Sequence, residues 1–300
     1  MRAIVRDEGG VRLARVPEPV PGADEVVIDV AFAGLCRSDL AAIDGAVVVA
    51  PGRVLGHELA GRVHEFGGEV TGLAPGDPVA AIPFWRCGAC AACAAGARCG
   101  APRWLGVDAD GAFAERVRVP ASCVVRLPAG LSLRRGAYVE PVAAALGVLP
   151  YVERGARVLV GGRGRIAELT ARVAAAHGAE VARSAAEVGT GFDVVIEHGG
   201  DPAALVSMLR PGGTLILKSR ARRLIALDAG EIVARELVIR GASHGSFEAA
   251  VNWLHGGMIA IDDLLAVPRP LEELAAVLAA ERAGEEYKQM FAIAPELEPA

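Results

Sequence analysis

Three side chains with the chemistry of metal ligands lie close together early in the chain. Cys36, His57 and Glu58 offer a thiolate, an imidazole and a carboxylate. Zinc accepts all three ligand types, and a set with fewer than four fixed protein ligands leaves a coordination position open for chemistry. Each residue alone is equally compatible with a packed core side chain. Their combination with the cysteine cluster that follows predicts a catalytic zinc site.

A second candidate metal site consists of four cysteines crowded into thirteen residues. The spacing is C-x2-C-x2-C-x5-C, formed by Cys87, Cys90, Cys93 and Cys99. Gaps of two residues let neighbouring thiolates converge on one ion at about 2.3 Å. Crowding of this kind favours a metal over disulfides in a cytosolic chain. Because four thiolates leave no open position, we expect a structural zinc here.

The composition excludes several classes of function. The 300 residues are 53% hydrophobic, the formal net charge is -5, and no basic run suggests nucleic acid. The first ten residues contain no apolar signal region, and no run of about 18 apolar residues is free of charges and breaks. We expect a cytoplasmic protein that acts on a small molecule and binds neither nucleic acid nor membrane.

Short β-branched runs bounded by turn residues dominate the first 130 residues. They predict an all-β unit, most simply a barrel. The runs are Glu25–Val30, Gly61–His64, Pro78–Ile82 and Ala114–Val119.

A strand, a glycine turn and a helix follow one another from Arg157. The run Arg157–Gly161 is apolar on both faces, as a buried parallel strand is, and a helical pattern extends through Ala176. Between them lies a G-x-G-x-x-A turn, whose glycines let the backbone approach a pyrophosphate at the helix N-terminus. We therefore predict Gly162, Gly164 and Ile166 as cofactor-binding residues.

The stretch after this helix is shorter than a complete nucleotide-binding domain requires. The next strand, Ala179–Arg183, ends without the acid that would bind an adenosine ribose. Only the link 186–191 then precedes the strand Phe192–Glu197, where a complete domain would have another helix and strand. Arg183 and Ser184 suit a 2′-phosphate, which favours NADP over NAD, although Arg183 is nearly as compatible with a solvated position.

The remaining patterns complete an alternating α/β fold. We predict strands at 213–218, 236–241 and 287–291, and helices at Pro202–Arg210, Phe247–His255 and after the turn 268–272.

These motifs together resemble the zinc-containing alcohol dehydrogenase family of the medium-chain dehydrogenase/reductase superfamily. The resemblance covers nearly the whole chain and implies a GroES-like β-barrel catalytic domain (1–142 and 265–300) and a doubly wound Rossmann domain (143–264). The piece missing from the Rossmann domain is then its third strand, an edge strand. The matching segments are 34–40, 56–58, 87–99, 106–115 and 139–141.

The resemblance also implies a ligand set for the catalytic zinc. In this family the metal takes the equivalents of Cys36 and His57 together with a later cysteine or glutamate, which is Glu140 here. The equivalent of Glu58 ligates in some states.

Two neighbouring residues receive roles from the same resemblance. Ser38 would pass the alcohol proton outward, and Asp39 would hold the second imidazole nitrogen of His57. This chain departs from the family at Ala41, where many relatives have a relay histidine, so the proton must leave from Ser38 through cofactor hydroxyls or water. The last gap of the cysteine cluster is also two residues shorter than the family pattern.

The implied activity is the reversible oxidation of a secondary alcohol to a ketone with NAD or NADP. The substrate would be a polyol, a sugar or a cyclitol-like alcohol, and the protein a homodimer or homotetramer. Two alternatives stay open: a non-catalytic zinc protein whose cofactor site has decayed, and a zinc-free NADPH reductase of the same superfamily.

The motifs predict two zinc ions per chain with separable roles. Cys36→Ala should remove one zinc and the activity while the fold survives, because that site is open and catalytic. Cys90→Ser should remove the other zinc and destabilise its loop. Elemental analysis of each purified variant, with thermal unfolding, measures both effects. Folded wild-type protein that is active without zinc would contradict this assignment.

Overall fold

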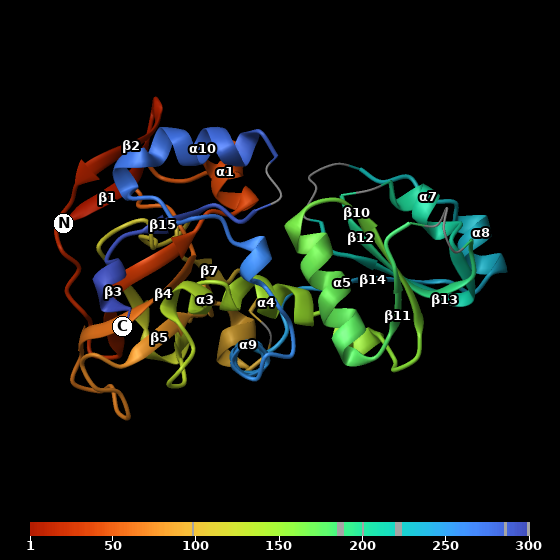
Figure 1. Ribbon diagram of the computed structural model, residues 1–300, viewed down its shortest axis with the longest axis horizontal. Helices are drawn as coiled ribbons and strands as arrows, with labels where there is room; N and C mark the ends of the chain where they lie inside the picture. Colours follow the sequence, from red (N-terminus) through yellow and green to blue (C-terminus); the bar gives the residue numbers. More distant parts are fainter. Residues whose placement is uncertain (98, 185–188, 200, 220–223, 285–286, 299–300) are drawn as a thin grey trace. The chain divides into compact units, whose positions relative to one another are not determined.

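The chain divides into two compact units in a computed structural model that describes residues 1–97, 99–184, 189–199, 201–219, 224–284 and 287–298 (Figure 1). Unit 1 comprises Met1–Glu140 and Asp262–Ala300, and unit 2 comprises Pro141–Ile261. The sequence placed these boundaries after residues 142 and 264. None of the helices in the described ranges has the length and apolar character needed to cross a membrane.

Unit 1 is built on a six-stranded antiparallel sheet. Five strands follow the order β15-β3-β4-β5-β9, and β8 pairs with β3 as well. Two small two-stranded sheets, β1-β2 and β6-β7, complete its strands. This arrangement is the GroES-like all-β unit predicted from the sequence. The strands are β1 (Arg2–Asp7), β2 (Gly10–Arg15), β3 (Glu25–Gly34), β4 (Glu58–Phe66), β5 (Pro78–Ala81), β6 (Phe84–Trp85), β7 (Arg103–Trp104), β8 (Arg116–Pro120), β9 (Val124–Arg126) and β15 (Met290–Ala292).

Helices in this part of the chain are short. They are α1 (Arg37–Ile43), α2 (Ala91–Ala94), α3 (Leu133–Gly136), α10 (Leu274–Arg282) and the 3-10 helices Ala121–Cys123, Asp262–Leu264, Leu271–Glu273 and Pro295–Leu297. Helix α4 (Val139–Leu146) begins in unit 1 and continues into unit 2, where Leu149–Tyr151 forms a further 3-10 turn.

The C-terminal strand returns to unit 1, as the sequence predicts. Strand β15 pairs antiparallel with β3, with Met290 opposite Gly34. Phe291 lies in the core of unit 1 against Phe113, with ring centroids 5.0 Å apart in an edge-to-face arrangement. The aromatic pair adds a directed contact to the aliphatic core, so the end of the chain is fixed to the barrel.

Unit 2 contains a five-stranded parallel sheet in the order β11-β10-β12-β13-β14. No strand lies beyond β11 in the described part of the chain, which agrees with a shortened doubly wound fold. The strands are β10 (Arg157–Gly162), β11 (Glu180–Ala182), β12 (Phe192–His198), β13 (Leu209–Leu217) and β14 (Val238–Gly241); the helices are α5 (Arg165–His177), α7 (Pro202–Val206), α8 (Ala229–Ala234) and α9 (Phe247–His255).

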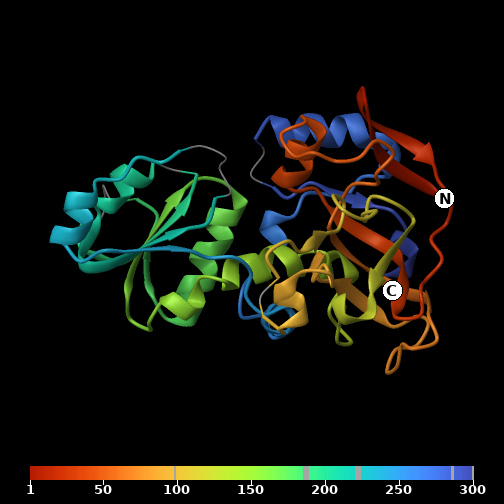
Figure 2. The same ribbon diagram turned by 180° about the vertical axis from the view of Figure 1, so that it is seen from behind.

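Alternate residues of these strands face two separate cores. Val158 and Val160 of β10 pack with Ala167 and Ala171 of α5 on one face. Leu159 faces the other core. That core includes Val206 of α7 and the partly buried Ile232 of α8. In Figure 2, which views the molecule from behind, α5 runs along one side of the sheet. Because successive side chains of a strand point to opposite faces, the apolar run of β10 supplies both cores.

One predicted helix is too long. The sequence pattern gave a helix over Pro202–Arg210, but α7 ends at Val206 and β13 begins at Leu209. Leu209 pairs with Phe192 of β12 and is buried, so the last residues of the predicted helix are part of the sheet instead.

The sequence also predicted a short link over residues 186–191. Residues 186–188 of this link lie outside the described residues.

Candidate active site

The ends of strands β3 and β4 bring the three predicted zinc ligands together. Cys36 follows β3, Glu58 begins β4, and the two strands pair so that Gly34 lies opposite Glu58. One ligand atom from each of Cys36, His57 and Glu58 lies within 4.8 Å of the others. A thiolate, an imidazole and a carboxylate in this arrangement form a donor set that fits zinc.

Asp39 connects two of these residues. One carboxylate oxygen of Asp39 accepts a hydrogen bond from the Cys36 backbone N–H at 2.8 Å, and the other lies 3.2 Å from His57 Nδ1. This contact leaves Nε2 of His57 for a metal. The exposed Ser38 places its Oγ 3.4 Å from that Nε2, beside the predicted metal position. Ser38 and Asp39 thus both lie next to the imidazole of His57, and their roles in proton transfer and ligand orientation stay predictions.

Two neighbouring groups together outweigh burial in setting the pKa of His57. Burial lowers this pKa, but the charges and hydrogen bonds of Asp39 and, to a smaller extent, Cys36 raise it well above its ordinary value. Zinc binds the neutral imidazole, so zinc uptake near neutral pH must release this proton.

A buried ion pair that the sequence analysis missed lies next to the ligands. Lys288 Nζ donates to a carboxylate oxygen of Glu58, and both side chains are 1% exposed. Lys288 precedes β15, whose pairing with β3 carries it to this position. A Cβ on Gly34 would lie 2.2 Å from Glu58 Oε2, so only glycine leaves room for the carboxylate. The sequence did contain a signal for this pair. Lys288 is a lysine within the apolar predicted strand 287–291, and lysines are rarely buried without a partner of opposite charge.

The electrostatics of Glu58 favour a cation at the site. Burial raises the pKa of Glu58, Lys288 lowers it and the negative charge of Glu140 raises it, with a net increase. Oε2 of Glu58 is buried and has no hydrogen-bond partner among the described residues. Such an oxygen costs free energy unless a cation or proton meets it. Glu140 is buried nearby but is not within the three-ligand group, and its role as a ligand stays a prediction.

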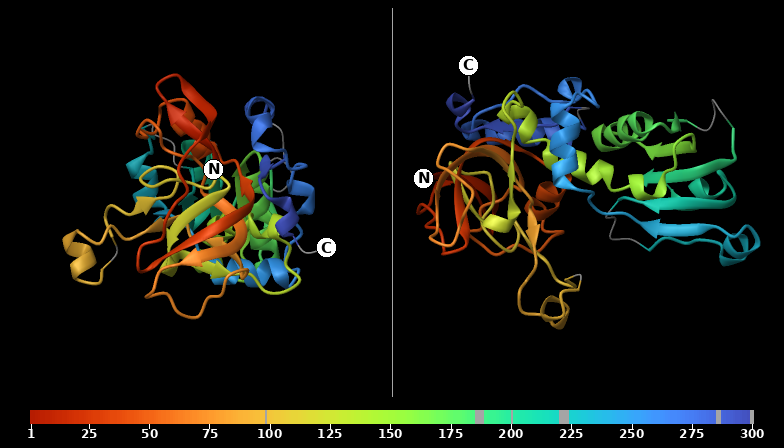
Figure 3. Two further views of the ribbon diagram at one scale, coloured as in Figure 1. Left: turned by 90° about the vertical axis from the view of Figure 1, so that its left-hand side faces the viewer. Right: turned by 90° about the horizontal axis from the view of Figure 1, so that it is seen from below.

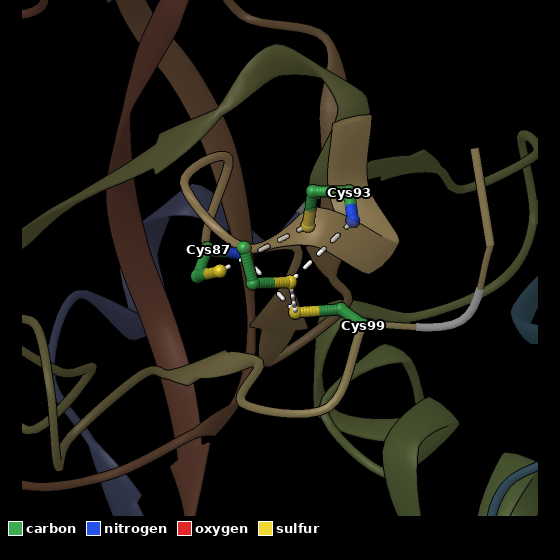
Figure 4. Close-up of side chains that lie close together, drawn as sticks. Cys87, Cys93 and Cys99 are labelled. Atoms are coloured by element: carbon green, nitrogen blue, oxygen red, sulfur yellow. Dashed lines mark hydrogen bonds between the residues drawn. The ribbon is translucent and has the colours of Figure 1, made fainter. Parts of the chain in front are cut away.

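The four predicted structural cysteines also converge. Their sulfur atoms all lie within 4.8 Å of one another, with 3.9 Å between Cys87 and Cys93 and between Cys90 and Cys99. Figure 3 shows the loop that carries α2 projecting from the strands of unit 1, and Figure 4 shows three of the cysteines gathered within it. All four are free thiols. A projecting loop with little packing of its own is a place where a closed zinc site supplies stability.

The surroundings of Cys87 and Cys93 lower the pKa of their thiols and so favour the thiolates that zinc binds, whereas the pKa of Cys99 is raised. The Arg86 side chain, which donates to the backbone carbonyls of Ala92 and Cys93, is the main cause that lowers the pKa of the Cys93 thiol to about 6. The backbone N–H of Cys87 points at the Cys99 sulfur at 3.4 Å. The buried Cys123, in contrast, has its pKa raised to about 11 by burial and is a packed core residue.

The glycine turn of unit 2 has the geometry expected of a dinucleotide-binding turn. Gly162 ends β10 with φ +97°, and Gly164 precedes α5 with φ +92°. A Cβ on Gly162 would lie 2.2 Å from the carbonyl oxygen of His198, so this position requires glycine. Ile166 is half-buried in the first turn of α5. Because neither glycine has a Cβ, a phosphate can come close to the backbone at this turn.

Arg183 is held at this turn. Its guanidinium donates to the carbonyl oxygens of Val160, Gly162 and Ala167 at 2.8, 3.2 and 3.4 Å. The side chain remains exposed, and its Nε lies 3.9 Å from a carboxylate oxygen of Glu168, so it is held at the turn while still in contact with solvent. Ser184 follows it and is half-buried.

Comparisons with known proteins agree with this fold and this site. A family profile described as the alcohol dehydrogenase GroES-like domain matches residues 22–129. The L-threonine 3-dehydrogenase of Streptomyces coelicolor is 33% identical over 288 residues, which are 91% of this chain and 80% of that protein. The chain belongs to the zinc-containing medium-chain alcohol dehydrogenase family.

Two further relatives illustrate the range of that family. A sorbitol dehydrogenase of Halalkalibacterium halodurans is 35% identical over 189 residues, which are 60% of this chain and 55% of that protein. A solved structure from Sinorhizobium meliloti, described as a zinc-binding dehydrogenase bound to NADP, has a TM-score of 0.87 and 27% identity, covering 97% of this chain and 98% of that one.

Zinc affinity at the Cys36–His57–Glu58 site should increase with pH around neutrality. The raised pKa of His57 means that zinc displaces a proton, and each proton released contributes a factor of about ten per pH unit. In Asp39→Asn the imidazole loses its carboxylate partner, so its pKa falls and the slope between pH 6 and 8 should become shallower. Chelator competition at several pH values measures this. Identical slopes for the two proteins would contradict the assigned role of Asp39.

The Glu58–Lys288 pair should be strongly coupled in zinc-free protein. Lys288→Met leaves a buried carboxylate without a counter-charge, which costs about 3–5 kcal/mol. Adding Glu58→Gln should recover much of that loss, whereas Arg12→Met, in a pair with Asp7 that is largely exposed, should cost less than about 1 kcal/mol. Urea unfolding of EDTA-treated variants measures the coupling. Additive losses in the double variant would show that the pair is not coupled.

Proposed function

We propose that this protein is a zinc-dependent dehydrogenase that reversibly oxidises a secondary alcohol to a ketone with NAD or NADP. One observation carries the proposal: Cys36, His57 and Glu58 present ligand atoms within 4.8 Å of one another, beside the exposed hydroxyl of Ser38. A closed structural site would not need an exposed hydroxyl next to a ligand nitrogen. The dinucleotide-binding turn at Gly162–Gly164 supports the same activity.

The names of the relatives support an alcohol as the substrate. Proteins similar to this one are named for sorbitol and for L-threonine, both of which contain a secondary alcohol. We therefore keep a polyol, a sugar or a cyclitol-like alcohol as the substrate class. Assembly as a homodimer or homotetramer stays a prediction.

The chain's own residues prepare the metal site. Cys36, His57 and Glu58 would hold the catalytic zinc, which polarises the substrate oxygen when bound, and Glu140 remains a candidate ligand. Asp39 fixes the imidazole so that Nε2 of His57 faces the metal position. Lys288 opposes the increase in the pKa of Glu58 that burial causes, which favours the ionised carboxylate. Cys87, Cys90, Cys93 and Cys99 would hold the structural zinc.

Ser38 is the residue best placed to move the substrate proton. Its Oγ lies beside Nε2 of His57 and its side chain is exposed, so one hydroxyl links the metal position with solvent. Ala41 supplies no relay imidazole. With a cofactor bound, Ser38 would hand the alcohol proton on towards cofactor hydroxyls or water.

Cofactor preference rests on Arg183 and Ser184. Arg183 stays fixed by three carbonyl oxygens, so it presents a localised positive charge at the turn that binds the cofactor. A 2′-phosphate would be attracted by this charge, and neither residue offers the carboxylate that favours NAD. A modest preference for NADP is the expectation.

The shortened sheet keeps one other function open. In the described residues the sheet ends at β11, so the adenine side of the cofactor site lacks the strand that a complete domain has there. A non-catalytic zinc protein with a decayed cofactor site would have the same fold and the same two groups of metal ligands. Binding of NADH or NADPH, followed by intrinsic tryptophan fluorescence, separates the two functions.

Ser38→Ala should slow alcohol oxidation about 10²- to 10⁴-fold without changing the zinc content, because a positioned acid–base group contributes that much. The control is Ser122→Ala, which changes an exposed serine in the 3-10 turn Ala121–Cys123. Turnover is measured against a panel of polyols and simple alcohols with both cofactors. Equal rates and pH profiles in Ser38→Ala and wild type would remove Ser38 from the proton path, and no turnover of any alcohol despite full zinc would contradict the proposed function.

A further inference from the structure

A histidine at the end of β12 lies against the dinucleotide-binding turn. His198 pairs with Gly162 in the parallel register between β12 and β10. Val194 and Ile196 of β12 face the core that contains α5. Because side chains of a strand alternate between faces, His198 projects on that same face, as position 162 does. Its imidazole is thus on the side of the sheet where α5 begins.

The imidazole has an unused hydrogen-bonding atom. Nε2 of His198 is buried and has no partner among the residues that the structure describes. The neighbouring charged groups are engaged elsewhere: Lys218 donates to the carbonyl oxygens of Ala144 and Ser243, and Glu197 accepts from Ser219. A buried polar nitrogen without a partner is unfavourable, and a ligand that supplies the missing hydrogen bond would remove this cost.

The ring is neutral at the pH of the cell. Burial, with the positive charges of Lys218 and Arg183, lowers the pKa of His198 to about 4, against a smaller opposing effect of Glu197. A neutral imidazole both donates and accepts one hydrogen bond. Its contact with a ligand therefore adds a directed hydrogen bond without adding charge.

The position of His198 identifies the class of ligand. In the sheet, β11 lies on one side of β10 and β12 lies on the other. The chain therefore reverses its direction of progress across the sheet between β10 and β12. Ligands of open parallel sheets bind outside the carboxyl ends of the strands at such a reversal. Gly162 and the start of α5 at Arg165 supply backbone N–H groups for an anion at this point.

We propose that Nε2 of His198 forms a hydrogen bond with an oxygen of the diphosphate, or of a ribose next to it, in bound NAD(H) or NADP(H). His198 is then a cofactor-binding residue of this chain, in addition to the glycines of the turn. The inference rests on the proposed use of a nicotinamide cofactor. Since both cofactors share the diphosphate and its riboses, His198 strengthens the binding of both equally, in contrast to Arg183, whose charge discriminates between them.

The test compares dissociation constants of NADH and NADPH by nicotinamide fluorescence. His198→Ala should weaken the binding of both cofactors by a similar factor, roughly three- to tenfold, as expected for one neutral hydrogen bond. His198→Gln places an amide nitrogen near the position of Nε2 and should retain most of the affinity. His198→Asn reaches only the position of Nδ1 and should bind as weakly as the alanine variant. His255→Ala, at an exposed histidine that ends α9, is the matched control and should bind as wild type does.

The outcomes separate this inference from the proposed function. Wild-type protein that binds neither cofactor overturns both. Wild-type binding with unchanged affinity in His198→Ala overturns only the role of His198. Weak binding in the glutamine and asparagine variants alike also overturns it, because the position of the nitrogen would then not matter. Thermal unfolding of each variant, compared with wild type, shows that the affinities refer to folded protein.

Discussion

The buried carboxylate of Glu58 is the constraint on which the candidate active site depends. It lies 1% exposed at the start of β4, where only a glycine at position 34 leaves space for it. A carboxylate in such surroundings needs positive charge, and Lys288 provides part of it from the far end of the chain. The remaining oxygen, with Cys36 and His57, forms an electron-rich site that a divalent cation satisfies. Strand β15 must therefore pair with β3 before the site is electrostatically complete.

Unit 2 tolerates a missing edge strand because its cores do not depend on that strand. The two faces of the remaining five strands are filled by alternating residues of β10, β12 and β13, which lie at the centre of the sheet. Removal of an outer strand leaves these contacts intact. What changes is the edge beside β11, where Arg183 now contacts three carbonyl oxygens of the glycine turn and the start of α5. The glycine turn is thus contacted by a side chain at the edge where the sheet is shortened.

Local spacing made some of these features predictable and long-range pairing hid others. The cysteine cluster, the G-x-G turn and the fold class follow from residues close in sequence. Lys288 could not be assigned to Glu58, because 230 residues separate them and only the β15–β3 pairing brings them together. His198 lies one residue beyond the predicted strand Phe192–Glu197, and only the register between β10 and β12 shows that it lies at the turn. The helix predicted over Pro202–Arg210 was too long because sheet pairing outcompeted helical propensity at Leu209.

The central claim is that Cys36, His57 and Glu58 hold a zinc ion distinct from the one held by the four cysteines. Anomalous diffraction on either side of the zinc absorption edge, from crystals of protein purified without chelators, tests it most directly. We predict two zinc peaks per chain, one within bonding distance of Cys36 Sγ and His57 Nε2 and one among the sulfur atoms of Cys87, Cys90, Cys93 and Cys99. A single peak at the four cysteines, with the Glu58–Lys288 pair intact beside an empty position, would contradict the account.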